Sequence, residues 1–165
     1  MRRGDRLRFW LVLALLVVLQ FSVRSRLGHD RVAPDFLLLA LLIYTIRGRP
    51  GASAVAGFVV GLLRDALTPA SFGAGALAHT LVGYLSAWSK AVFFAENLVV
   101  NGGLFFAGTM LRNIVIALAS GKLAGPQMVW ELLVWSPLQG LTTAMTGVVV
   151  LVLFRHWLAI RLGES

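Results

Sequence analysis

The sequence contains no cysteine, and only 13% of its 165 residues are charged. The absence of cysteine excludes disulfide bonds, cysteine-ligated zinc and thiol catalysis together. The three histidines, His29, His79 and His156, lie far apart in the sequence. The H-E-x-x-H, G-x-S-x-G and P-loop patterns, which position metal ligands, nucleophiles or phosphate-binding backbone, are missing as well. We therefore expect a chain that is not an enzyme and has no cofactor or metal site of its own.

Apolar residues are abundant, making up 58% of the chain, and the mean hydropathy is +0.83. Apolar runs of this length can cross a bilayer, so the sequence predicts an all-α integral membrane protein with one domain over residues 1–165. The formal net charge of +8 invites comparison with nucleic-acid-binding proteins. The basic residues, however, lie at the edges of the apolar runs, where they act as topology signals. No nucleic-acid partner is expected.

The apolar runs predict a bundle of six transmembrane helices. The expected spans cover residues 8–24, 34–46, 51–67, 73–89, 98–119 and 128–155. The first run is followed by no A-x-A-like cleavage site, which favours an uncleaved span over a signal peptide. The second is short, so a tilted or partly re-entrant segment is an alternative. In the last, Pro137 either kinks one long helix or marks its true start, with Ser136 as N-cap and residues 128–135 at the interface.

The distribution of lysine and arginine predicts the orientation of these spans. With the N-terminus inside, the cytoplasmic segments hold nine basic residues and the outer segments hold five, Arg112 within a span being left out. Basic residues accumulate on the cytoplasmic side of membrane proteins. The sequence therefore predicts a multi-pass membrane protein with both termini in the cytoplasm.

Residues 50–85 form the stretch around which the rest of the chain is organised, two apolar helices joined by a short turn. Small and polar residues recur every four positions along one face of each helix. They are Ser53, Gly57, Gly61 and Asp65 in the first helix and Gly75, His79 and Gly83 in the second. Small residues at this spacing allow helix backbones to approach closely in lipid. We expect this small-residue stripe to lie at a close helix contact, inside the bundle or against a partner's single span.

Two acidic residues stand near the expected ends of helices. Pro34-Asp35 opens the second run, where proline suits the first helical turn and an acid complements the positive N-terminus of the helix. Asp65 falls in the last turn of its helix, where the helix dipole disfavours an acid. An intramembrane aspartyl pair is conceivable, but the position of both acids near helix ends favours capping or a solvated interface.

Arg112 is the basic residue that most needs a partner, because it lies inside the fifth apolar run. An arginine near the centre of a span costs ~2.5–3.5 kcal/mol on insertion scales. Counting residues from the expected span ends places Arg112, Asp65 and His79 at one depth in the outer third of the bilayer. We therefore predict that Asp65 pairs with Arg112, with His79 nearby as a hydrogen-bonded interior histidine. The alternative for Asp65 is a solvated position beside Arg64.

Several motifs of the chain resemble those of a known family. They are Pro34-Asp35-Phe36-Leu37-Leu38-Leu39, the run G-F-V-V-G-L-L-R-D from Gly57 to Asp65, Pro69-x-x-x-Gly73, and Gly83-Tyr84-Leu85. Together with a proline-containing last span that ends in basic residues, they are similar to the MreD family of rod shape-determining proteins. The resemblance extends over nearly the whole chain.

Membership of this family implies a non-enzymatic inner-membrane scaffold of the bacterial cell-elongation machinery that binds MreC and is surrounded by membrane lipids. Through MreC it would act with the actin-like filament protein MreB and the peptidoglycan synthase pair RodA and PBP2. Its role would be to help control cell shape and peptidoglycan synthesis. The resemblance also implies a six-helix fold distantly similar to the substrate-binding components of energy-coupling-factor transporters.

That distant similarity supplies an alternative function, the substrate-binding membrane component of a vitamin-type transporter. A vitamin pocket needs convergent polar and aromatic groups, for which Trp88, Trp130, Trp135 and Asn101 are candidates. Tryptophans near the ends of spans are, however, ordinary interfacial anchors. The sequence therefore favours the scaffold, and leaves open the stoichiometry and the face that meets a partner.

Overall fold

The computed structural model of the chain describes residues 3–22, 31–67, 73–92, 97–121 and 125–158, which form helices and no strand. The all-α prediction is confirmed for these ranges. The helices are α1 (Arg3–Ser22), α2 (Phe36–Thr45), α3 (Pro50–Leu67), α4 (Ala74–Val92), α5 (Leu98–Ser120), α6 (Pro126–Trp130), the π-helical turn η3 (Glu131–Trp135), α7 (Ser136–Leu153) and α8 (Arg155–Leu158). Residues 23–24 of the first expected span, His29 and Pro69 lie outside the described residues.

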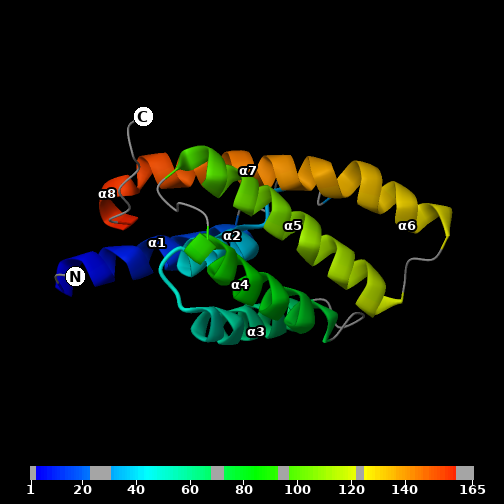
Figure 1. Ribbon diagram of the computed structural model, residues 1–165, viewed down its shortest axis with the longest axis horizontal. Helices are drawn as coiled ribbons and strands as arrows, with labels where there is room; N and C mark the ends of the chain where they lie inside the picture. Colours follow the sequence, from blue (N-terminus) through cyan, green and yellow to red (C-terminus); the bar gives the residue numbers. More distant parts are fainter. Residues whose placement is uncertain (1–2, 23–30, 68–72, 93–96, 122–124, 159–165) are drawn as a thin grey trace.

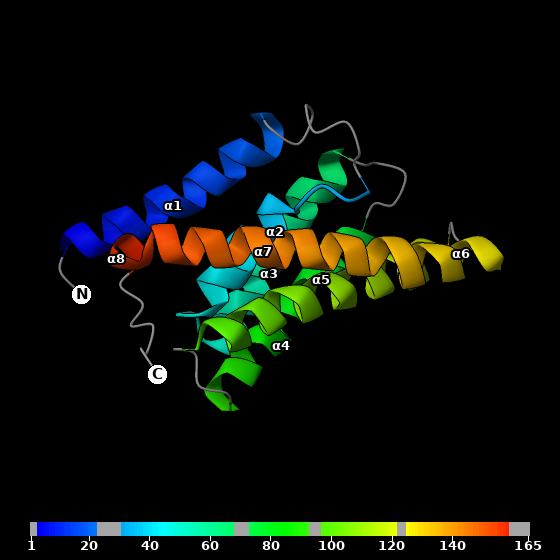
Figure 2. The ribbon, with the colours of Figure 1, turned by 90° about the horizontal axis from the view of Figure 1, so that it is seen from above.

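Helix α2 is the central element, in place of the hairpin of residues 50–85 around which the sequence predicts the chain to be organised. It contacts α1, α3, α4, α5 and α7 (Figure 1, Figure 2). Nine of its ten residues are buried, as expected for a helix that is apolar on every side. Ten residues extend for only ~15 Å, half of a hydrocarbon core of ~30 Å. The second apolar run therefore forms a short core helix that cannot cross a bilayer by itself.

Helices α3 and α4 pack so closely that their backbones touch. A Cβ atom on Gly57 would lie 2.1 Å from the carbonyl oxygen of His79, and one on Gly83 would lie 2.3 Å from the carbonyl oxygen of Ser53. At Gly61 the nearest atom would be the Cα of Ala76, at 2.4 Å. No side chain larger than the hydrogen atom of glycine fits at these three positions. The structure thus places the small-residue stripe at a helix contact inside the bundle.

The last apolar segment is one long helix, Pro126–Leu153, which Figure 1 shows crossing the whole molecule. Of the two alternatives for Pro137, the start of a new helix is wrong, since Ser136 has helical angles (φ −64°, ψ −45°). Proline lacks an N–H group and its ring clashes with the carbonyl one turn earlier. The π-helical turn η3 precedes Ser136-Pro137 and widens the helix there. The wider turn accommodates both the proline ring and the missing N–H group.

Within the part of the chain that the structure describes, two helices are long and apolar enough to cross a membrane by length and composition, Leu98–Ser120 and Pro126–Leu153. The surface of the bundle is apolar on the other helices as well, with Trp10 on α1 exposed to 58%, Val55 on α3 to 65% and Trp88 on α4 to 56%. Many polar side chains, in contrast, are buried between the helices. Membrane proteins distribute their residues in this way, with polar groups facing the interior.

Candidate functional site

Asp35 is the polar group around which the interior is arranged. It is the N-cap of α2, and its Oδ1 accepts a hydrogen bond from the backbone N–H of Leu38 at 3.1 Å. The prediction of a helix-start acid is therefore confirmed, although Pro34 precedes the cap and does not occupy the first helical turn, which begins at Phe36. Asp35 is also completely buried, and a buried carboxylate needs positive partners.

Two arginines supply the positive charge. Arg64 from the last turn of α3 and Arg112 from the middle of α5 both donate to Oδ2 of Asp35. The side chain of Arg112 is 3% exposed and that of Arg64 is 18% exposed, so the shared carboxylate is screened from solvent. Separating a buried ion pair is far more costly than separating an exposed one. This three-residue charge cluster therefore joins α3 and α5 to the start of α2.

A group of amides holds Arg112 in place on its other side. Its Nη2 donates to Oε1 of Gln139 at 2.9 Å, and its Nε donates to Oδ1 of the adjacent Asn113 at 3.0 Å. Asn113 also donates to Gln139 Oε1 at 3.0 Å, while Gln139 Nε2 donates to the carbonyl oxygen of Ala33 at 3.3 Å. The network extends the charge cluster to α7 and to the segment that leads into α2.

The backbone around the start of α2 is also bonded by side chains from α1 and α7. Gln20 Oε1 accepts from the N–H groups of Phe36 at 3.0 Å and Leu37 at 3.4 Å. The N–H of Asp35 itself donates to Thr143 Oγ1 at 3.3 Å. The first N–H groups of a helix have no partner within it, and a buried helix start is stable only if side chains supply one. Helices α1, α3, α5 and α7 therefore meet at one buried helix terminus.

The predicted pair between Asp65 and Arg112 is wrong. Asp65 is 1% exposed and accepts three backbone N–H groups at the start of α4, from Gly73 at 2.9 Å, Gly75 at 3.0 Å and Ala76 at 2.9 Å. The acid stands at the negative end of α3, but the positive end of α4 lies against it and supplies the stabilising field. Its solvated alternative is wrong for the same reason.

His79 belongs to the same end of α4. Its Nδ1 lies 2.8 Å from the carbonyl oxygen of Gly75, and because a carbonyl only accepts, this nitrogen carries the hydrogen. The structure therefore places His79 as a hydrogen-bonded interior histidine. It is linked to Asp65 through Gly75, whose carbonyl oxygen bonds His79 and whose N–H bonds Asp65. Its Nε2 and the hydroxyl of Ser53 are buried and have no hydrogen-bond partner among the described residues.

Replacing Asp65 with asparagine tests this capping role. One amide oxygen cannot accept all three N–H groups, so we expect the free energy of unfolding to fall by about 1 kcal/mol. Thermal unfolding in detergent measures the change. Glu131→Gln is the matched control, because it neutralises an acid that is 34% exposed and forms only a 4.0 Å contact with Arg31. Equal effects of the two substitutions would contradict a specific cap.

Sequence reasoning missed several members of the site. Arg64 is one of the five outer basic residues whose distribution predicts the orientation, and no motif singles out Gln20 or Gln139. A usable signal was present, since both glutamines stand inside long apolar runs. A polar side chain in such a run normally faces the protein interior and has a partner there.

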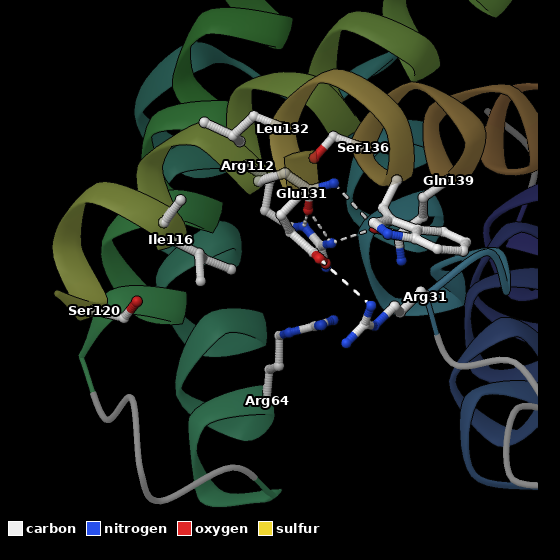
Figure 3. Close-up of a pocket in the computed structure, with 12 residues that line it drawn as sticks. Arg31, Arg64, Arg112, Ile116, Ser120, Glu131, Leu132, Ser136 and Gln139 are labelled. Carbon is white, nitrogen blue, oxygen red and sulfur yellow. Dashed lines mark hydrogen bonds and ion pairs between the residues drawn. The ribbon is translucent and has the colours of Figure 1, made fainter. Parts of the chain in front are cut away.

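A cavity of about 240 Å³ opens beside the charge cluster, between α5 and the η3–α7 segment (Figure 3). Arg31, Arg64 and Arg112 contribute guanidinium groups to its wall, and Asn113 and Gln139 contribute amides. Ile116, Leu132 and Trp135 form apolar parts of the lining. In the described part of the chain, no three histidine or acidic side chains gather into a metal-binding group. The cavity therefore offers hydrogen-bond donors and three guanidinium groups, with Glu131 as the acidic residue of its lining.

The fold and the site define an all-helical protein with an apolar exterior and an interior fastened by buried charges and amides, the pattern of a membrane-embedded bundle. The family model of the rod shape-determining protein MreD matches residues 1–160. The chain therefore belongs to the MreD family, which confirms the resemblance and gives it a role in the determination of rod shape. A search of curated proteins and a search of solved structures find no match, so they lend no support to the expected similarity to transporter components.

Proposed function

We propose that this chain is a non-enzymatic scaffold of the cell-elongation machinery in the bacterial inner membrane, which binds MreC and through it helps to control peptidoglycan synthesis. The family match over residues 1–160 carries the proposal. The interior supports it, because the buried groups around Asp35 are bonded to one another and to helix ends, as in a framework. A rigid bundle of this kind presents fixed helix faces to partners.

The proposed topology is six crossings of a single domain with both termini in the cytoplasm. The second crossing combines α2 with the irregular segment 31–35 before it. Helix α2 covers ~15 Å of the ~30 Å core, and the segment 31–35, which begins with a turn and a bend, covers part of the remaining depth. Irregular backbone is tolerated at membrane depth where protein surrounds it. Here Thr142 Oγ1 donates to the carbonyl oxygen of Val32 at 2.6 Å, and Gln139 donates to that of Ala33.

The cysteine-free sequence makes this topology directly testable. Single cysteines are introduced by Gly4→Cys, Arg49→Cys and Lys122→Cys, and intact cells are treated with a membrane-impermeant maleimide. We expect labelling of Lys122→Cys alone, since position 122 follows α5 on the outer side, and labelling of the other two only after permeabilisation. The parent chain is the unlabelled control. Labelling of Gly4→Cys or Arg49→Cys in intact cells would contradict the orientation.

The MreC interaction is tested by co-expression of the tagged full chain with MreC from the same genome, followed by purification in detergent. We expect MreC to be retained at a fixed ratio, and mass spectrometry to identify it in material from native cells. An unrelated multi-pass protein with the same tag is the control. Absence of MreC from the purified protein, with transporter ATPase subunits in its place, would contradict the scaffold.

A further inference from the structure

We propose that the cavity beside the charge cluster binds a phosphate group, presented by the head of an anionic phospholipid or by a soluble phosphate compound. The inference is independent of MreC binding, because it rests on the lining of the cavity. Three arginines and two primary amides converge there from α3, α5, α7 and the segment before α2. Figure 3 shows the side chains of Arg31 and Arg64 directed toward the same open space, with Arg112 close by.

The charges of the lining favour an anion. Among the described residues that form the wall, three are arginines and one, Glu131, is acidic. Asp35 lies behind Arg64 and Arg112 and supplies one further negative charge. Three positive and two negative groups leave one positive charge around the cavity. Guanidinium groups bind phosphate oxygens through parallel N–H donors, and they do so most strongly where water is partly excluded.

The cavity is large enough for a small polar group. A volume of about 240 Å³ holds several molecules of water, each of which occupies ~30 Å³ in the liquid. It lies below the ~300–1,000 Å³ of pockets that enclose drug-sized ligands. A phosphate with its attached ester oxygens fits this volume.

Arg31 and Trp135 lie next to each other in the wall of the cavity. The Arg31 guanidinium lies 5.5 Å from the centre of the Trp135 ring and 4.0 Å from Glu131, with its side chain 63% exposed. A contact this long and exposed contributes little, so Arg31 can turn to an arriving anion at low cost. Trp135 lines the cavity, and its indole N–H is buried without a hydrogen-bond partner among the described residues.

The test uses the full chain purified in a maltoside detergent, which carries no phosphate. Phosphatidylglycerol in mixed micelles with the maltoside and, separately, inorganic phosphate at constant ionic strength are titrated into the protein. The thermal unfolding temperature and, by native mass spectrometry, the number of bound lipids are recorded at each step. We expect a saturable rise in unfolding temperature with at least one probe. A response to phosphatidylglycerol alone identifies a lipid head group, and a response to inorganic phosphate identifies a soluble source.

Two substitutions with matched controls distinguish the cavity from general surface attraction. Arg31→Gln removes a charge-assisted hydrogen bond and is expected to weaken binding roughly tenfold or more, whereas Arg49→Gln removes an exposed arginine outside the cavity lining and leaves binding unchanged. Ser120→Phe fills the cavity at constant charge and abolishes binding, while Ala119→Phe adds the same bulk at an exposed position outside the lining. No saturable response in the parent chain, or equal responses in all four variants, would overturn the proposal.

Discussion

Replacement of Asp35 by alanine is expected to lower the free energy of unfolding by about 3–5 kcal/mol, enough to prevent accumulation of the protein. The substitution leaves Arg64 and Arg112 without the carboxylate that both contact in the interior. It also removes the N-cap of the central helix, whose first turn is buried. Thermal unfolding in detergent and the yield of monodisperse protein measure the effect.

Asp35→Asn separates the two contributions. Asparagine caps helices about as well as aspartate, so the hydrogen bond to the Leu38 N–H is retained while the charge is lost. We expect this variant to recover only the capping part, ~1 kcal/mol, and to remain strongly destabilised. If Asp35→Asn were as stable as the parent chain, the ion pairs would contribute little and Asp35 would act only as a helix cap.

Gly57→Ala is expected to destabilise the bundle by about 1–3 kcal/mol. The new methyl group would be placed 2.1 Å from the carbonyl oxygen of His79, and because this oxygen belongs to a helix backbone, α3 and α4 must separate to accept it. Their separation also shifts Asp65, which caps α4 across the same contact. The change is measured by thermal unfolding in detergent.

Gly103→Ala is the matched control. Gly103 is exposed in the second turn of α5, and a Cβ there would meet no atom within 4 Å. In an open helical position alanine is favoured over glycine by ~0.5–1 kcal/mol, so this variant should gain stability where Gly57→Ala loses it. A neutral or stabilising Gly57→Ala would show that the two backbones are further apart than the structure places them.

Features that depend on local sequence could be predicted well. The helical class and the approximate limits of α3, α4 and α5 follow from the apolar runs, and the capping role of Asp35 follows from its position before one of them. The spacing of Gly57, Gly61 and Gly83 indicates a close contact because small residues on one helical face have few other uses. Each of these inferences needs only the residues of one helix or hairpin.

The partner of Arg112 could not be predicted, because it depends on how helices from distant parts of the chain are arranged. Residue counting gave Asp65 and Arg112 the same depth, but depth fixes neither the rotation of a helix nor the order of its neighbours. The central position of α2, which is too short to cross a membrane alone, brings Asp35 to Arg112 across 77 positions of sequence. The carboxylate of Asp65 instead accepts hydrogen bonds from backbone N–H groups at the start of the adjacent α4. A search for oppositely charged side chains does not consider backbone partners of this kind.

The central claim is that the buried start of α2, with Asp35 held between Arg64 and Arg112, fastens the scaffold together. A double-mutant cycle in detergent tests it most directly, with Asp35→Asn, Arg112→Gln and the combined variant, beside a second cycle in which Asp65→Asn replaces Asp35→Asn. We predict a coupling energy of about 1–3 kcal/mol between Asp35 and Arg112, and additive effects for Asp65 and Arg112. Additivity in the first cycle, or strong coupling in the second, would contradict the account.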